Sequence, residues 1–457
     1  MPMEDARLSA LDLSFLCLEN SASPMHLGAV AVFRPDAQAS AAEVVGLLTE
    51  RARQVPRMRR RVVPTAFPPG GAAWAEDPDF DPRAHVHHHE LPGGGREDLA
   101  ALVAEVMAAP LDRDRPLWEL HVVSGLDGGR FGLLAKMHHA MCDGQGAIGI
   151  GLSLLDGGLS LPSARAAAAR RTTAPQPSGL VGRSGQLLGG AIGAAAGAYG
   201  TASGLLGQAT RAFDIASAVL ATMRAPAPSP LLAPPSGTRR AAFVGLEVRE
   251  LQRIRRAMGG TVNDVLLAVV TGALRHWLAT HGRPLPGLRA LIPASQRARS
   301  GGSEDGNQLS AYLCELPVGE DDPVERARRV RAEMETNKAR GPLRGAGAIP
   351  VLAGVVPPAL HRLAAPLAAH AAPLLFDLVV TSVPLPPLPL RLGGAELEEL
   401  YPIAPLASGH TLAVGMSRYR DKVHIGLYAD GVALPDLEKI SEALPRAVAE
   451  LLEAAGH

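Results

Sequence analysis

The sequence predicts an α/β protein of the α+β type, built as two units that a linker joins. The chain has 457 residues, and one hydrophobic core rarely serves more than roughly 250–300 residues. Hydrophobic residues make up 47% of the chain, which is enough apolar material for two cores. Segments with the periods of strands and helices occur on both sides of a long stretch rich in Ala, Gly, Pro and Ser.

The first unit covers residues 1–160 and mixes both kinds of element. Alternating or β-branched residues predict strands, whereas apolar residues three and four positions apart predict helices. The predicted strands are Leu27–Phe33, Leu117–Val123 and Phe131–His139, and the predicted helices are Ala41–Gln54 and Asp98–Met107, the second capped by Asp98.

The composition of residues 161–238 predicts that they form the linker, because they are rich in small residues and end in the Pro-rich segment Ala225–Pro235. Within them, Leu187–Thr210 carries no charged residue. A transmembrane helix needs about 20 predominantly apolar residues, but this stretch has few large apolar side chains. We interpret it as an Ala/Gly-rich helix of the linker, and attachment to the surface of a bilayer or lipid droplet stays open.

The second unit covers residues 239–457 and is again of the α+β type. Its predicted elements are the helix Val262–Thr280, the strands Leu288–Pro293 and Leu309–Leu316, a hairpin of Leu412–Ser417 and Val423–Tyr428 around Arg418–Lys422, and a final helix Leu437–Leu452 that is kinked or interrupted at Pro445.

Composition excludes several classes of function. Lys plus Arg and Asp plus Glu both number 45, and no long basic run occurs, so there is no electrostatic case for binding nucleic acid. Cys17, Cys142 and Cys314 lie far apart without a CxxC, which argues against a disulfide framework and a zinc site. The acidic N-terminus lacks the pattern of a signal peptide, so we expect the protein in the cytoplasm.

The segment from His138 to Asp143 carries the chemistry. It joins the predicted strand Phe131–His139 to a helix that begins near Gly144. Successive strand residues point to opposite faces, so one histidine should face a cleft and the other the core. Asp143 is spaced to fold back on the turn and fix the imidazole or its loop. Because an imidazole titrates near neutrality, the HHxxxDG pattern predicts a catalytic site with His139 as general base.

Two other patterns invite a functional interpretation that their surroundings do not support. Gly144–Gly149 satisfies GxGxxG, but Ala164–Thr172 lacks the acidic residue that a dinucleotide site needs about 20 positions further on. In a strand, His85, His87 and His89 would share one face. Since only Glu90 could support a metal there, we predict a solvated edge strand and no metal site.

Further short segments accompany HHxxxDG in a specific order along the chain. They are Leu11-Asp12-Leu13-Ser14-Phe15 with Pro24–Gly28, Pro116-Leu117-Trp118-Glu119, Asn263-Asp264, and Tyr401-Pro402 with Val423–Asp430. In this order they resemble the bacterial wax ester synthase/diacylglycerol acyltransferase family. That family belongs to the CoA-dependent acyltransferases, together with chloramphenicol acetyltransferase and the condensation domains of peptide synthetases.

The resemblance implies two chloramphenicol-acetyltransferase-like halves with the active-site channel between them. His139 would deprotonate the acceptor alcohol, which attacks the acyl-CoA thioester directly without an acyl-enzyme. Acyl-CoA is then a substrate, and no cofactor is needed. The resemblance makes Asp143, beside Gly144, mainly structural and pairs it with an arginine of the second half, Arg297. Asn263 and Asp264 would begin a helix, as its cap or beside the active site.

One segment departs from the family. Residues 381–386 read Thr-Ser-Val-Pro-Leu-Pro, where the family typically has Ser-Asn-Val-Pro-Gly-Pro. Thr381 or Ser382 could still donate a hydrogen bond to the oxyanion of a tetrahedral intermediate.

The expected function is transfer of a fatty acyl group from acyl-CoA to a long-chain alcohol or diacylglycerol, in wax ester or triacylglycerol synthesis. Two alternatives stay open: an O-acyltransferase of specialised metabolism, and a non-catalytic condensation-like module that binds a carrier protein or lipid. Intact His139, Asp143 and Arg297 favour an enzyme. An acyl carrier protein could also replace CoA as the donor.

Overall fold

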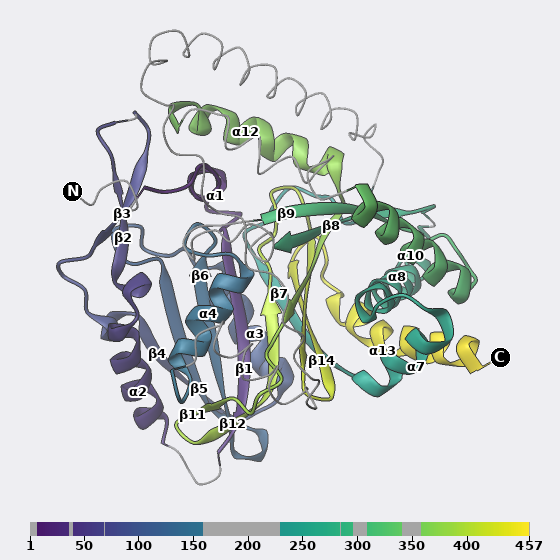
Figure 1. Ribbon diagram of the computed structural model, residues 1–457, viewed down its shortest axis with the longest axis horizontal. Coiled ribbons are helices and arrows are strands. Elements are labelled where there is room, and N and C mark those ends of the chain that lie inside the picture. The colour runs from purple at the N-terminus through teal and green to yellow at the C-terminus, as the bar shows by residue number, and fades with distance from the viewer. Residues whose placement is uncertain are drawn as a thin grey trace, which may run out of the picture.

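The computed structural model describes residues 7–35, 40–67, 69–158, 229–283, 285–295, 309–340 and 358–456. Two six-stranded sheets lie side by side, with helices on both faces of the first sheet and a group of helices packed against the second (Figure 1). Leu187–Thr210 and Arg297 lie outside the described residues.

The first sheet has the strand order β11-β12-β1-β6-β5-β4. Its strands are β1 (His26–Arg34), β4 (Val86–Gly94), β5 (Trp118–Leu126), β6 (Arg130–His138), β11 (Arg391–Leu392) and β12 (Ala395–Ile403). The helices α2 (Ala41–Gln54) and α4 (Gly144–Leu154) bury their apolar residues on one face. Helix α3 (Arg96–Ala108) packs on the other face and also contacts β7 of the second sheet.

The second sheet has the strand order β7-β14-β13-β10-β8-β9. Its strands are β7 (Arg239–Glu247), β8 (Leu288–Ser295), β9 (Leu309–Leu316), β10 (Leu378–Pro384), β13 (Leu412–Tyr419) and β14 (Lys422–Asp430). The helices that accompany it are α7 (Val248–Met258), α8 (Val262–Thr280), α10 (Pro323–Arg340) and α13 (Leu437–Gly456). Helix α8 is buried along most of its length in the largest apolar core.

The two halves of the chain interlock through β12, which follows β10 in sequence but pairs antiparallel with β1 of the first sheet. Where β12 passes over β13 and β14, Gly415 and Gly426 lie under the carbonyl oxygen of Pro402. A Cβ at either glycine would clash with that oxygen, so this close approach of the backbones requires glycine.

Two helices and a hairpin lie beyond one end of the strands of the first sheet (Figure 1). Helix α1 (Ala10–Leu18) packs against α12 (Pro358–Leu375), so an N-terminal helix meets one from the second half of the chain (Figure 1). The hairpin of β2 (Arg60–Pro64) and β3 (Ala72–Glu76) projects beside α1.

The sequence predicts several elements with their bounds. The helices Ala41–Gln54 and Val262–Thr280 and the strand Leu309–Leu316 are confirmed as predicted. Asp98 is not the cap of α3, because Gly95 holds that position and donates its N–H to the Asp98 carboxylate at 3.0 Å. Helix α13 continues as one helix through Pro445.

Within the described ranges, no single helix meets the length and hydropathy of a membrane span. The bent pair α7–α8 meets them together, although most residues of α8 are buried in the protein core.

Candidate active site

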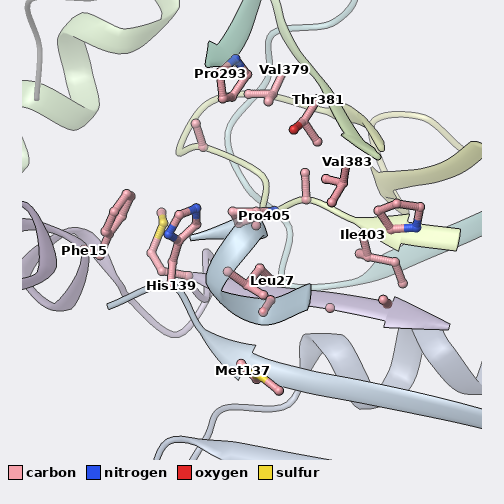
Figure 2. A pocket seen from close by; sticks show the side chains of 18 of the residues that line it. Phe15, Leu27, Met137, His139, Pro293, Val379, Thr381, Val383, Ile403 and Pro405 are labelled. Carbon is pink, nitrogen blue, oxygen red and sulfur yellow. The ribbon is translucent and has the colours of Figure 1, made fainter. Parts of the chain in front are cut away.

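A cavity of about 680 Å³ lies between the two sheets. The first sheet contributes alternate residues of β6, which are Leu133, Ala135 and Met137, followed by His139 just beyond the strand. The second sheet contributes Val379, Thr381 and Val383 of β10, and α12 covers a further side. Figure 2 shows side chains from both sheets converging on this space.

His139 lies in the cavity wall, in the first position after β6. Its backbone N–H donates to the carbonyl of Met25 at 2.8 Å. The imidazole stacks on the ring of Phe15 with the centroids 4.1 Å apart, and its Nδ1 is buried. Both the backbone and the ring are therefore held, and the predicted base faces the cavity.

His138 lies on the opposite face of the strand, as the alternation of strand residues predicts. It is buried, and its Nδ1 accepts the backbone N–H of Ala140 at 3.0 Å. Its Nε2 lies 3.5 Å from the Glu19 carboxylate, which also lies 3.3 Å from Nε2 of His26. Burial raises the pKa of Glu19, but the imidazoles of His138 and His26 beside its carboxylate outweigh this effect and hold that pKa well below its usual value. His138 thus belongs to a largely buried polar cluster with Glu19 and His26 beneath the site.

Asp143 is fully buried and caps α4. Its carboxylate accepts the backbone N–H of Gly146 at 2.7 Å, which satisfies a donor of the first helical turn. Gly144 follows in the cavity wall, and a Cβ there would lie 3.5 Å from Val383 of the second sheet. The HHxxxDG loop therefore turns from β6 into α4 right at the cavity.

Thr381 and Ser382 occupy successive positions of β10 and face opposite ways. Thr381 lines the cavity (Figure 2). Ser382 is exposed and does not line it. The structure thus separates the two residues that the sequence leaves as alternatives.

Asn263 and Asp264 lie in the first turn of α8, which begins at Val262, and neither lines the cavity. The N-cap is Thr261, and the Asp264 carboxylate accepts the backbone N–H of Thr261 at 2.8 Å in a capping box. Asp264 thus stabilises the start of a core helix, whereas Asn263 is not its cap.

His85, His87 and His89 do not lie together on one face of a strand. His87 and His89 lie on β4, the edge strand, as predicted. His85 precedes the strand, is buried, and stacks on Trp118. His89 instead meets His121 at 3.0 Å, and no group of three or more suitable side chains that could hold a metal ion is found among the described residues.

Two contributors to the wall were not identified as functional from the sequence. Phe15 belongs to a segment that matches the family resemblance, but no periodicity places its ring on His139. Helix α12 brings His361 into the wall, with its Nδ1 3.0 Å from the hydroxyl of Ser14. Residues more than 300 positions apart meet there, which a linear pattern does not reveal.

Two family domains match the chain. The wax ester synthase/diacylglycerol acyltransferase catalytic domain matches residues 8–266, and the WS/DGAT C-terminal domain matches residues 305–452. A relative named a probable diacylglycerol O-acyltransferase in Mycobacterium tuberculosis is 33% identical over 97% of this chain and 95% of its own. A second probable diacylglycerol O-acyltransferase of the same organism is 31% identical over 97% of this chain and 98% of its own.

Solved structures give the same result for the fold. The wax ester synthase/diacylglycerol acyltransferase from Marinobacter aquaeolei VT8 superposes with a TM-score of 0.70 at 25% identity, covering 99% of this chain and 100% of that one. The trichothecene 15-O-acetyltransferase of Fusarium sporotrichioides has a TM-score of 0.60 at 15% identity, covering 98% of this chain and 94% of that one. The first condensation domain of the calcium-dependent antibiotic synthetase has a TM-score of 0.59 at 18% identity, covering 99% and 97%. These last two similarities show the two-halved fold alone.

Proposed function

Because this chain belongs to the wax ester synthase/diacylglycerol acyltransferase family, and is thus an acyl-CoA-dependent acyltransferase, we propose that it esterifies the hydroxyl of diacylglycerol or of a long-chain alcohol. The observation that carries the proposal is the position of His139, whose imidazole lies in the wall of a largely apolar cavity. Such a cavity accommodates fatty chains, and the imidazole supplies the base that a hydroxyl needs.

The proposed reaction is one direct transfer. Nε2 of His139, the ring nitrogen other than the buried Nδ1, takes the proton of the acceptor hydroxyl. The hydroxyl oxygen forms a bond to the thioester carbon, which becomes tetrahedral. The C–S bond then breaks, CoA leaves as a thiolate, and the imidazolium returns the proton to that sulfur. No acyl-enzyme forms and no cofactor takes part, so acyl-CoA is a substrate only.

The oxyanion of the tetrahedral intermediate needs a hydrogen-bond donor. We assign this role to the Thr381 hydroxyl, because that side chain enters the cavity from β10, across from the sheet that carries His139. Ser382 is exposed outside the cavity and has no part in it.

We assign Asp143 a structural role, which its position as the N-cap of α4 supports. The pairing of Asp143 with Arg297 stays a prediction, since Arg297 lies outside the described residues.

Water-insoluble substrates require access to a lipid surface, and we propose that the β2–β3 hairpin provides the contact. No charged residue occurs from Val62 to Ala75, and Phe67 at the tip is 75% exposed. The hairpin is tied to the start of α1, because Leu8 donates its N–H to the carbonyl of Ala72 at 2.9 Å. Docking of the tip would therefore bring the helix that lines the cavity close to the lipid.

The proposal is tested by release of the CoA thiol from palmitoyl-CoA with hexadecanol, with diacylglycerol and without acceptor. We expect acceptor-dependent release that His139→Ala abolishes while the thermal unfolding curve stays intact, and that a metal chelator leaves unchanged. Turnover retained in His139→Ala would contradict the mechanism. Wild-type protein that releases no CoA with either lipid acceptor would contradict the proposed acceptors.

A further inference from the structure

An arginine from outside the HHxxxDG segment holds the loop that carries His139. Arg57, in the short helix η1 (Pro56–Arg59), donates from both Nε and Nη2 to the carbonyl oxygen of Met141, at 3.0 and 2.7 Å. Resting on the proposed role of His139 as base, we propose that Arg57 is a positioning residue for the reaction, which acts through the carbonyl of Met141.

Three hydrogen bonds within the loop join residues that are close in the sequence. The N–H of Met141 donates to the carbonyl of His138 at 2.9 Å, and the N–H of Ala140 donates to Nδ1 of His138. The Asp143 carboxylate accepts from Gly146. The carbonyl of Met141 is instead bonded by a side chain 84 positions away, so the tertiary structure fixes this point of the loop.

The bond is costly to lose because the loop is buried. Ala140 and Met141 have no exposed surface, so without Arg57 the carbonyl would lose a charged donor in a place closed to solvent. Two N–H groups of one planar guanidinium also restrict the direction of the carbonyl more than a single donor would.

Arg57 is itself held in place. Its guanidinium lies over the ring of Trp74 on β3, 5.2 Å from the ring centroid, and Trp74 is buried. A cation over an aromatic face is attracted to it and has fewer rotamers open to it. The loop is therefore anchored to a rigid support at the base of the β2–β3 hairpin.

The position of Arg57 predicts which kinetic constant, kcat or KM, changes when its side chain is removed. Arg57 does not line the cavity, whereas His139, two residues before Met141, does. Relaxation of the loop would shift the imidazole but leave the apolar walls that bind both chains. Because a misplacement of about 1 Å can cost roughly 100-fold in rate, kcat should fall while KM stays near the wild-type value.

The chain offers a matched control in Arg51. It donates from Nη1 to the carbonyl of Leu154 at 2.7 Å and pairs with Asp156 at 2.7 Å. This is the same kind of contact, an arginine on a backbone carbonyl, but at the far end of α4. Arg51→Met should therefore affect folding without moving the catalytic loop.

The experiment measures kcat and KM for CoA release from palmitoyl-CoA with the preferred lipid acceptor, in wild type, Arg57→Met, Arg57→Lys, Arg57→Ala and Arg51→Met. We expect kcat to fall about 10- to 100-fold in Arg57→Met with KM nearly unchanged. Arg57→Lys, which can still donate to the carbonyl, should recover part of the rate. Added guanidinium should raise kcat of Arg57→Ala and have no such effect on Arg51→Met.

Equal losses of kcat in Arg57→Met and Arg51→Met, at the same folded fraction, would overturn the inference. A change confined to KM would overturn it as well. If Arg57→Met does not fold, the comparison of wild type with Arg57→Lys decides. The donor geometry of Lys differs from that of Arg, so wild-type kcat and KM in Arg57→Lys would contradict a positioning role. Wild-type protein without acceptor-dependent release would instead overturn the proposed function on which the inference rests.

Discussion

The phenyl ring of Phe15 lies almost parallel to the imidazole of His139, with centroids 4.1 Å apart and planes inclined by 22°. Phe15 belongs to α1, whose start is fixed by a capping box of Ser9 and Asp12 and which packs against α12. One face of the imidazole is thus covered by carbon, and the orientation of the ring depends on a helix from another part of the chain.

Removing the Phe15 ring should therefore impair the base. We expect Phe15→Ala to lower kcat about 10-fold, because the imidazole gains rotational freedom and water reaches its face. Phe15→Leu, which keeps an apolar cover, should lose less. Steady-state kinetics with the lipid acceptor measure both, and wild-type kcat in Phe15→Ala would show that the stacking has no catalytic consequence.

Thr381 and Ser382 form a natural pair of test and control. Thr381→Val keeps the shape of the side chain but removes the hydroxyl, and we expect kcat to fall roughly 10- to 100-fold if this hydroxyl donates to the oxyanion. Ser382→Ala removes a neighbouring hydroxyl outside the cavity and should leave kcat unchanged. Similar kinetics for the two variants would rule out the proposed role of Thr381.

Asp143 should contribute to stability as well as to activity. Asp143→Ala removes the N-cap of α4, which costs about 1 kcal/mol in typical helices, and it should lower the melting temperature and kcat together. Asp143→Asn retains a cap and should be less harmful to folding. Thermal unfolding and kinetics on the same preparations test this. Loss of activity in Asp143→Ala with an unchanged melting temperature would indicate a purely catalytic role.

The buried His424 should make the fold sensitive to acid. Burial lowers its pKa to about 4, from 6.5 in the unfolded chain, and neither ring nitrogen has a hydrogen-bond partner among the described residues. Because the unfolded chain takes up this proton first, the free energy of unfolding should decrease as the pH falls from about 6.5 to about 4 and then level off. The difference between these two pKa values corresponds to a loss of at most about 3 kcal/mol in the free energy of unfolding.

Denaturant unfolding at pH 7 and at pH 5 measures this effect. His424→Phe should lose less stability than the wild type between these two values, because the titrating group is gone. Burial also lowers the pKa of His26 and His410, so part of the acid sensitivity should persist in the variant. An identical loss in both proteins would contradict the assignment to His424.

Phe67 at the hairpin tip can be compared with Val432, another large exposed hydrophobic side chain, which is 68% exposed. We expect Phe67→Asp to reduce flotation with phospholipid vesicles and activity on vesicle-borne diacylglycerol, since a charge at the tip opposes insertion. Activity on a short, water-soluble alcohol should persist. Val432→Asp should change neither, and equal flotation of wild type and Phe67→Asp would exclude the hairpin as the contact.

The sequence by itself predicts the local structure and the side chain that is proposed as the catalytic base, His139. The period of Ala41–Gln54 and of Val262–Thr280 predicts both helices, because amphipathic spacing and capping residues are local properties. Strand alternation likewise puts His138 and His139 on opposite faces and leaves one of them for the cleft. The order of short segments along the chain then indicates the family.

The tertiary structure alone decides which side chains surround His139. Phe15 on His139, Arg57 on Met141 and Thr381 across the cavity come from segments far apart in the chain, and no local period encodes their meeting. The same holds for β12, which leaves the second half of the chain to pair with β1. Such contacts form because two separate apolar faces must be buried against each other, a condition on the whole fold and not on any one segment.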